Sequence, residues 1–360
     1  MEWLLLIFVI PYVYLLLRLF LKLNKILPYA ASADPDEFIS VVIPCHNEEK
    51  YLPRLLKCIE DQDQRCDLFE VIIVDDNSTD STYALASGFK SIKNVRVVKN
   101  KGNGKKLAIM EGVSASRGSF IITTDADCMP GRKWISTIAA FVQENKPDIV
   151  ICPVMLESKP GFPNRFQELE FLSLQGVTAG AYTAGRPVMC NGANLVFRRD
   201  IYLLNAKSLH PEIQSGDDIF LLHGIKKYPG AKISWLESGE AIMITSRSET
   251  LKEYINQRSR WISKAGAYED RDTIILGLVT FCAVAIQLFT LIAGIFSTVF
   301  LAVFGVIFLL KSLPDFLILR NTTRRYGKPY LMNWFLPCQM IYPFYVVTVI
   351  VISVLKRVSR

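Results

Sequence analysis

Residues Val41–Glu48, with the sequence VVIPCHNE, form an apolar run that gives way abruptly to polar residues. Consecutive apolar residues are typical of a parallel strand that is buried on both faces. The same change occurs where Val71–Val74 leads into Asp75–Ser78 and where Phe120–Thr123 leads into Asp125–Asp127. Because parallel strands present their carboxyl ends at one edge of a sheet, we expect these polar residues to lie together at that edge.

Helical patterns separate these runs along the chain. The alternation of strands and helices predicts a doubly wound α/β fold with a mostly parallel sheet. The further expected strands are Val95–Val98 and Ile149–Val154, and the expected helices are Glu48–Glu60, Lys105–Ser116 and Lys133–Glu144.

The composition of the 360 residues restricts the class of protein. With 51% hydrophobic and 21% charged residues, the chain is too apolar for a disordered protein and too charged for membrane helices alone. The eight cysteines are scattered and include no C-x-x-C pair, which indicates reduced thiols rather than disulfides or zinc ligands. The net charge of +7 comes largely from Lys and Arg beside the apolar segments, and no basic stripe indicates a nucleic-acid partner.

The N-terminal apolar run, Trp3–Leu23, is long enough to cross a bilayer of about 30 Å, and we expect an uncleaved anchor over residues 1–25. The alternative is a signal peptide cleaved at Ala31–Ala33. Against it, the start of the chain lacks a basic segment, the run is too long, and the site lies too far beyond it. Arg18 and Lys22 lie near the C-terminal end of the run, which predicts a cytoplasmic middle domain.

The C-terminal region, residues 273–355, is expected to hold about three spans. Thr273–Leu310 carries no charge and is long enough for two of them, with a turn near Gly294. A further span fits Trp334–Leu355. Four spans with the middle domain inside would place the basic tail outside, so either this last segment is re-entrant or Leu313–Leu319 also inserts.

Three polar segments of the middle domain carry candidate ligands. Asp125 and Asp127 are two carboxylates at a strand end, which suit Mg²⁺ or Mn²⁺ with further ligands from water and a substrate diphosphate. A carboxylate of the segment Asp75–Ser78 could accept the imide N–H of a uracil base, although this segment also fits an Asx turn that leads into a helix. Lys105 opens a helix after a glycine loop, where a cation either meets phosphate oxygens or faces solvent.

Asp218 is the candidate general base. It lies at the start of an apolar helix, Ile219–Ile225, and a carboxylate can deprotonate a sugar hydroxyl within hydrogen-bond reach. The structural alternative is a capped helix start with Ser215 as the N-cap. The two roles are compatible, since a capped helix start would hold the carboxylate rigidly.

Gln257, Arg260 and Trp261 lie at positions i, i+3 and i+4 of an expected helix over Leu251–Lys264, so they share a face. The helix fits an amphipathic segment at a membrane surface. As part of a site, Trp261 would offer an apolar platform for a sugar and Arg260 a cation for a diphosphate.

Together these segments resemble the inverting family 2 glycosyltransferases with a GT-A fold, in particular the membrane-bound branch. The resemblance runs from about Val41 to Trp261 and continues as a general pattern of C-terminal spans. The matching segments are, in order, VIPCHNEE (42–49), VDDNS (74–78), GK (104–105) with Gly112, DAD (125–127), GDD (216–218) and QRSRW (257–261).

The resemblance implies a role for each candidate. Asp127 ligates the metal, Asp125 faces the ribose and diphosphate, and Asp218 is the base, with Asp217 where a Glu is more usual. Gln257, Arg260 and Trp261 match the Q-x-x-R-W motif of the cellulose, hyaluronan, poly-N-acetylglucosamine and ceramide-glucoside synthases, which include chain-building and single-transfer enzymes. The nucleoside is lined by Pro44, His46, Glu48 and Asp76, with Lys105 nearby.

The implied activity is the metal-dependent, inverting transfer of a hexosyl or N-acetylhexosaminyl group from a UDP-sugar to a lipid or growing glycan at the cell membrane. The alternative is a catalytically inactive assembly subunit of a polysaccharide-export system. In both cases polysaccharide-assembly proteins are candidate partners. The expected domains are the anchor (1–25), the GT-A domain (38–248), an amphipathic interface helix (249–270) and the C-terminal spans (273–355).

Overall fold

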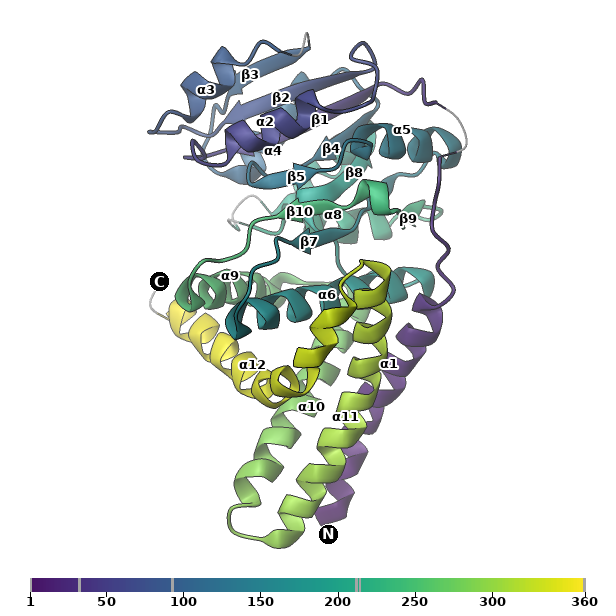
Figure 1. Cartoon of the computed structure of the whole chain (residues 1–360), viewed down its shortest axis with the longest axis vertical. Coiled ribbons are helices and arrows are strands. Elements are labelled where there is room, and N and C mark those ends of the chain that lie inside the picture. The colour runs from purple at the N-terminus through teal and green to yellow at the C-terminus, as the bar shows by residue number, and fades with distance from the viewer. Residues whose placement is uncertain (1, 32–33, 92–93, 211–212, 214, 359–360) are drawn as a thin grey trace. The chain divides into compact units, whose positions relative to one another are not determined.

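The computed structural model describes residues 2–31, 34–91, 94–210, 213 and 215–358 (Figure 1). Ser32 and Ala33, which belong to the disfavoured cleavage site, lie outside the described residues. The chain divides into two compact units, which we call the sheet unit and the helical unit. The sheet unit comprises Leu27–Glu157 and Met189–Ser246, and the helical unit comprises Met1–Ile26, Ser158–Val188 and Arg247–Arg360.

The main sheet of the sheet unit has seven strands, namely β1 (Ile39–Cys45), β2 (Phe69–Asp75), β3 (Val95–Lys99), β4 (Phe120–Thr123), β6 (Ile149–Ile151), β8 (Leu195–Arg198) and β9 (Ile233–Trp235). Their order is β3-β2-β1-β4-β8-β6-β9. β1 pairs in parallel with β2 and β4, whereas β8 runs antiparallel to β4 and β6. The expected α/β fold with a mostly parallel sheet is thus confirmed.

The expected strand over Ile149–Val154 is wrong, because the chain makes two strands in different sheets there. β6 ends at Ile151, and Pro153 follows, which has no N–H to donate to a ladder. The next strand belongs to a small second sheet, which consists of β5 (Cys128–Pro130), β10 (Met243–Thr245) and β7 (Val154–Leu156).

Helices flank the main sheet (Figure 1), namely α2 (Leu52–Glu60), α3 (Thr82–Gly88), α4 (Lys105–Ala115), α5 (Trp134–Asn145), α7 (Arg199–Leu204) and α8 (Asp217–Lys226). α2 begins at Leu52 rather than at Glu48, with Pro53 in its first turn, where the missing N–H costs nothing. The start of α8 also differs from the expectation. Its N-cap is Gly216, which has a left-handed φ of 91° and no capping side chain, so Ser215 is not the cap.

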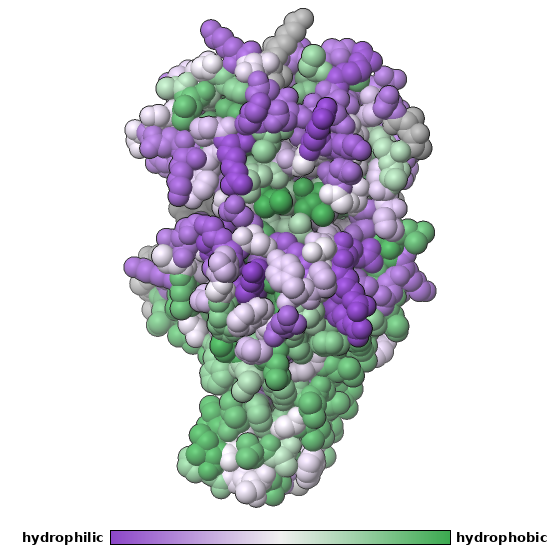
Figure 2. Space-filling view, viewed as in Figure 1, coloured by the Kyte–Doolittle hydropathy of each residue, from purple (hydrophilic) through white to green (hydrophobic). Residues whose placement is uncertain are grey.

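The helical unit contains η1 (Glu2–Phe8), α1 (Ile10–Leu23), α6 (Phe162–Thr183), α9 (Leu251–Ser263), α10 (Arg271–Ala293), α11 (Thr298–Arg325), η6 (Pro329–Trp334) and α12 (Phe335–Val358). Within the described residues, four helical segments are long and apolar enough to span a membrane, namely Glu2–Leu23, Arg271–Ala293, Thr298–Arg325 and Pro329–Lys356. Figure 2 shows the hydrophobic surface of the α10–α11 hairpin, where Phe289, Ile295 and Phe296 are exposed.

Two glycines of α6 allow this helix to pack closely against α1 and α11. A Cβ atom on Gly176 would lie 2.3 Å from the Thr322 hydroxyl oxygen of α11, and one on Gly180 would lie 2.7 Å from the Leu19 carbonyl oxygen of α1. Small residues four positions apart permit such contact between helices. α6 lies inside the expected 38–248 domain in sequence but packs in the helical unit.

A buried ion pair within α11 is hydrogen-bonded to α1 and α12, two other helices that could span a membrane. Lys311 of α11 donates to Asp315 Oδ2 at 2.8 Å. The Asp315 carboxylate also accepts from Tyr12 Oη of α1 at 2.6 Å and from Gln339 Nε2 of α12 at 2.8 Å. Charges inside an apolar bundle are costly unless paired, and these contacts satisfy them.

The segment η6–α12 starts in contact with α6 and ends in contact with α9, and neither of these helices is among the four candidate spans. Just before η6, Lys328 Nζ donates to Glu168 Oε1 of α6 at 2.9 Å. Near the end of α12, Lys356 Nζ donates to Asn256 Oδ1 of α9 at 2.6 Å. Pro343 lies within α12, where a proline kinks a helix. The segment therefore returns to α9 instead of running to the turn between α10 and α11, which favours the re-entrant alternative.

Candidate active site

Hydrogen bonds join the polar segment after β1 to the polar segment after β2. The His46 ring Nδ1 lies 2.6 Å from the Asp76 carbonyl oxygen, and the Asn47 amide donates to Ser78 Oγ at 3.1 Å. The Glu48 amide donates to Thr82 Oγ1 at 2.7 Å. The structure thus brings together the ends of two neighbouring strands, as the strand pattern predicted.

The Asp76 carboxylate accepts hydrogen bonds from the loop that precedes α4 and contains Gly104. Its Oδ1 accepts from Asn100 Nδ2 at 2.6 Å, and both carboxylate oxygens accept from the Gly104 amide at 2.9 Å. Gly104 has a φ of 97°, which favours glycine at this position. The neighbouring Asp75 has a buried carboxylate oxygen, Oδ1, with no hydrogen-bond partner. Because such atoms are rare in folded proteins, this oxygen is a candidate acceptor within the segment that the sequence singled out.

Lys105, at the start of α4, is the cation of the site. Its Nζ lies 2.5 Å from Asp125 Oδ1. Burial alone would lower the pKa of Lys105, but the charges of Asp125, Asp217 and Asp218 together raise it above its ordinary value. The charges of the carboxylate after β4 and of the acidic pair of α8 therefore act on one ammonium group, although they lie about ninety residues apart in sequence.

Asp127 lies in the turn between β4 and β5. The Thr245 hydroxyl of β10 donates to both of its carboxylate oxygens at 3.4 Å. Burial, followed by the charge of Asp125, raises the pKa of Asp127. Burial and then the charges of Asp127 and Asp125 likewise raise the pKa of Glu48 to about 7. Mutual repulsion among these carboxylates is the electrostatic condition that a divalent cation relieves.

The donor set fits a partly hydrated hard cation. Among the residues that the structure describes, no three His, Cys, Asp or Glu side chains are placed to hold a metal ion. Asp125 and Asp127 can supply two carboxylate ligands, and Mg²⁺ typically takes its remaining ligands from water and substrate phosphates. The residues present are therefore compatible with Mg²⁺ or Mn²⁺ in the presence of a diphosphate.

Asp218 is held by backbone amides at the start of α8. Its Oδ2 accepts from the Gly192 amide at 3.1 Å, and its Oδ1 accepts from the Ile219 amide at 2.8 Å. The adjacent Asp217 has a raised pKa, because burial and the charges of Asp218 and Asp125 outweigh the attraction of Lys105. The α8 start thus presents one carboxylate in a fixed orientation and a second beside it.

Gln257, Arg260 and Trp261 lie on α9, in the helical unit, and their membership of one site with the sheet-unit carboxylates stays a prediction. The sequence pattern missed the intervening Arg258. Its guanidinium lies 4.0 Å from the centre of the Trp261 ring and pairs with Glu170 of α6 at 2.5 Å. The spacing of three residues between Arg258 and Trp261 is the signal that could have indicated this stacking.

Comparison with known proteins gives a family for the middle of the chain. Residues 40–203 match the family model described as glycosyl transferase family 2. The poly(ribitol-phosphate) beta-N-acetylglucosaminyltransferase TarS of Staphylococcus aureus is 29% identical over 128 residues, which cover 34% of this chain and 22% of that protein. The undecaprenyl-phosphate 4-deoxy-4-formamido-L-arabinose transferase of Aeromonas hydrophila is 40% identical over 95 residues, which cover 25% of this chain and 29% of that protein. The chain therefore spans less than a third of the length of these two relatives.

Among solved structures, the mannosyltransferase PcManGT from Pyrobaculum calidifontis, in complex with GDP-Man and Mn²⁺, matches 98% of this chain and 99% of its own chain. The TM-score is 0.55 and the sequence identity is 15%. At this level of identity the match establishes a shared fold, in agreement with the sheet order described above.

Proposed function

This chain contains a glycosyl transferase family 2 domain, and we propose that it is an enzyme that moves a sugar from a UDP-sugar to a membrane-associated acceptor. We propose that the transfer inverts the configuration at the anomeric carbon. The observation that carries this proposal is the contact of the Lys105 ammonium with Asp125, together with the raised pKa of Lys105, to which the charges of Asp217 and Asp218 contribute. A metal-binding carboxylate and a general base would have to meet across one substrate, and this arrangement supports that requirement.

In the proposed reaction, the Asp218 carboxylate takes the proton of an acceptor hydroxyl. The acceptor oxygen forms a bond to the anomeric carbon while the bond from that carbon to the diphosphate oxygen breaks, and UDP leaves with the electron pair. The amides of Gly192 and Ile219 keep the Asp218 carboxylate in place for this transfer. Asp125 and Asp127 would hold Mg²⁺ or Mn²⁺, which when bound neutralises charge on the leaving diphosphate.

The nucleoside would lie over the segments after β1 and β2, lined by Pro44, His46, Glu48 and Asp76. Because Asp76 already accepts three hydrogen bonds from the loop before α4, we propose that it shapes this pocket. The unpaired oxygen of Asp75 is then the candidate acceptor for a base N–H. Lys105 would meet the phosphates from the helix start.

Gln257, Arg260 and Trp261 would contribute from α9 to the binding of the donor and acceptor sugars. The support is the Q-x-x-R-W pattern and the partial exposure of Trp261. Arg258 would fix the indole plane from one face through its stacking contact. Sugar rings commonly pack on such apolar platforms, and the other face of the ring is the one that we propose for substrate.

The acceptor is proposed to be a lipid-linked or growing glycan at the cytoplasmic face of the membrane. Four segments can span a bilayer, and one relative is named for an undecaprenyl-phosphate acceptor. Residues 2–17 and 273–310 contain no Lys or Arg, whereas basic residues gather at the other ends of α1 and α11. By the positive-inside rule those basic ends face the cytoplasm. Polysaccharide-assembly proteins remain candidate partners.

The test is nucleotide release by the full-length chain in membranes supplied with native lipid extract. A panel of UDP-sugars and GDP-sugars is offered with Mg²⁺ or Mn²⁺, and each reaction is repeated with EDTA. We expect release with one UDP-sugar and loss of release with EDTA. Release with a GDP-sugar alone would contradict the donor assignment, and no release with any donor would favour the inactive assembly subunit.

A further inference from the structure

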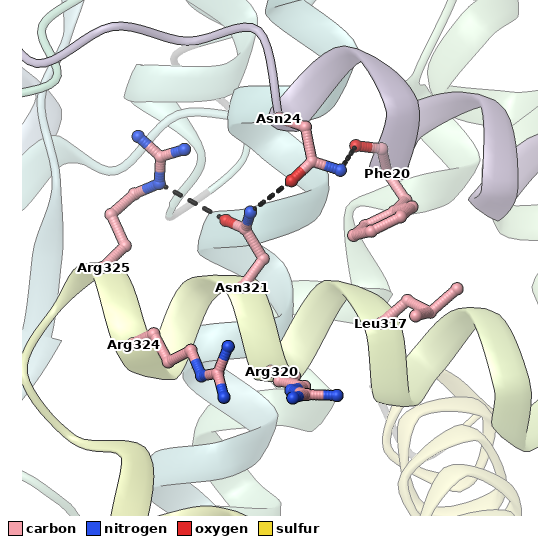
Figure 3. A pocket seen from close by; sticks show the side chains of 7 residues that line it. All are labelled: Phe20, Asn24, Leu317, Arg320, Asn321, Arg324 and Arg325. Atoms are coloured by element: carbon pink, nitrogen blue, oxygen red, sulfur yellow. Dashed lines mark hydrogen bonds between the residues drawn. The ribbon is translucent and has the colours of Figure 1, made fainter.

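A pocket of about 520 Å³ lies in the helical unit between the C-terminal ends of α1 and α11 (Figure 3). α1 contributes Phe20 and Asn24 to its lining. The remaining lining residues come from α11 and include Leu317, Arg320 and Arg324. Positions 317, 320 and 324 follow helical spacing, so α11 presents one apolar and two cationic side chains along one face.

Hydrogen bonds between the two helices fix the wall of this pocket. Asn321 Nδ2 donates to Asn24 Oδ1 at 2.7 Å (Figure 3). Arg325 donates to the Leu23 and Ile26 carbonyl oxygens at the end of α1, at 3.2 and 3.3 Å. The Leu23 carbonyl oxygen also accepts from the Ile26 amide at 3.2 Å, so Arg325 is a further donor at this helix end. The pocket is therefore part of the built interface of the two helices.

Arg320 and Arg324 are not used in this way. Both side chains are exposed, and in the described part of the chain neither forms an ion pair. The acidic residue closest in sequence, Asp315, is paired with Lys311. Figure 3 shows the two guanidinium groups next to each other along α11, where like charges one turn apart repel. An anion between them would remove this repulsion.

We propose that this pocket binds the phosphate group of a membrane lipid. Two guanidinium groups can hold phosphate oxygens by charge-assisted, bidentate hydrogen bonds. Phe20 and Leu317 provide apolar contacts for the first part of a lipid chain beside the same pocket. The site lies at the ends of two segments that are long and apolar enough to span a membrane. The ends of such segments fall at the depth of lipid head groups, and basic pockets between them suit phosphorylated head groups.

Two kinds of lipid share this chemistry, namely an anionic phospholipid and a polyprenyl phosphate. The experiment separates them. The full-length chain in neutral detergent is titrated with short-chain phosphatidylglycerol, a short polyprenyl phosphate, phosphatidylcholine and inorganic phosphate, and bound lipid is counted by native mass spectrometry. Tighter binding of phosphatidylglycerol identifies a phospholipid site, and tighter binding of the polyprenyl phosphate identifies a lipid-carrier site.

The variant R320Q/R324Q is expected to weaken lipid binding by about tenfold for each lost charge-assisted contact. R18Q/K25Q removes one positive charge from α1 and one from the residues just after it, both outside the pocket lining, and is the matched control. If R320Q/R324Q unfolds, R320K/R324K keeps the charges but loses the bidentate geometry and should bind with intermediate affinity. Unchanged binding in the pocket variant, equal losses in both double variants, or equal affinity for phosphatidylcholine or free phosphate would overturn the proposal.

This inference goes beyond the proposed transferase function, because lipid binding is measured without sugar transfer. A chain that transfers no sugar could still bind lipid in this pocket, and an active transferase could fail to bind it. Failure of the lipid proposal and failure of the proposed transferase function are therefore distinguishable.

Discussion

Lys105 is the residue on which the electrostatics of the candidate active site depend. Its ammonium group is the counter-charge to Asp125 and to the acidic pair at the start of α8. Without it, these carboxylates would face one another and an incoming diphosphate with no compensating charge. In the proposed function, a cation at this position offsets the repulsion between these carboxylates and a negatively charged donor.

We predict that Lys105→Met raises the KM for the nucleotide sugar by about ten- to a hundredfold, since one charge-assisted hydrogen bond contributes about 1.5–3 kcal/mol. Lys105→Arg keeps the charge and should recover most of the affinity. Initial rates at varied donor concentration provide the measurement. An unchanged KM in Lys105→Met would show that this ammonium does not act on the donor.

At this scale the sequence predicted which polar loops follow the strand ends, but not the contacts within them. The polar residues after β1, β2 and β4 were predictable, because parallel strands end at one edge. The pairing of Lys105 with Asp125 depends on how α4 docks, and no local pattern encodes that. The sequence also left open which carboxylate of Asp75–Ser78 would accept a base N–H, and in the structure both oxygens of Asp76 accept from the Gly104 amide.

Among the elements, β2 carries a buried carboxylate that anchors its neighbours. Glu70 accepts from Ser40 Oγ of β1 at 2.7 Å, from Arg96 of β3 at 2.7 Å and from the Arg117 amide at 2.6 Å. Burial acts to raise its pKa, but these donors outweigh burial and lower the pKa below the ordinary 4.5. The ionised carboxylate therefore stabilises the fold above pH 4.5, and this contribution is lost as the pH falls through the lower pKa of the folded state.

Glu70→Gln is expected to reduce the free energy of unfolding by about 1–3 kcal/mol at neutral pH, because charged donors lose their partner. The variant should also lose less stability than the wild type between neutral pH and acid. Thermal unfolding of the detergent-solubilised protein as a function of pH tests both points. Glu240→Gln, which alters an exposed carboxylate, is the control and should follow the wild type. Parallel acid limbs for Glu70→Gln and the wild type would contradict the assignment.

The packing of α6 gives a second prediction for a single element. Gly180→Ala places a methyl group 2.7 Å from the backbone carbonyl of Leu19, which cannot move without α1. We expect a loss of about 1–3 kcal/mol and a lower Tm. Gly277→Ala in α10 meets no atom within 4 Å and serves as the control, with an unchanged or slightly higher Tm. Equal Tm values for the two variants would show that α6 and α1 are not in close contact.

Strands made of continuous apolar residues were predictable from the sequence. The points at which an apolar run breaks between two strands were harder to predict. β1, β2 and β4 are close to their expected limits, since a buried parallel strand needs apolar residues on both faces. The run Ile149–Val154 gave no sign that it serves two sheets, because Pro153 alone marks the break. The role of Gly176 and Gly180 was also hidden, as small residues are informative only once their neighbours are known.

For the whole molecule, the path of η6–α12 decides the membrane topology. The contacts of Lys328 with α6 and of Lys356 with α9 bring both ends of the segment back to helices outside the spans. We therefore propose that α1, α10 and α11 cross the membrane and that α12 enters it and returns, although α12 is also long and apolar enough to span. In this proposal the basic end of α12 lies on the same side of the membrane as the basic ends of α1 and α11, as the positive-inside rule requires.

Cysteine labelling tests this topology in intact cells. Ile295→Cys marks the α10–α11 turn and Lys356→Cys marks the end of α12, in a background where the exposed Cys66 and Cys282 are replaced by Ser. A membrane-impermeant maleimide should label position 295 from outside and position 356 only after the cells are permeabilised. Labelling of position 356 in intact cells would show that α12 crosses the membrane.

The central claim is that Asp218 is the base of a sugar transfer, and its most direct test is the initial rate of UDP release by Asp218→Asn with the donor that the wild type uses. Asp61→Asn, an exposed carboxylate on the far end of α2, is the matched control. We predict that Asp218→Asn lowers kcat by about 10²–10⁴-fold while donor binding persists, and that Asp61→Asn keeps the wild-type rate. Full activity in Asp218→Asn would contradict the account.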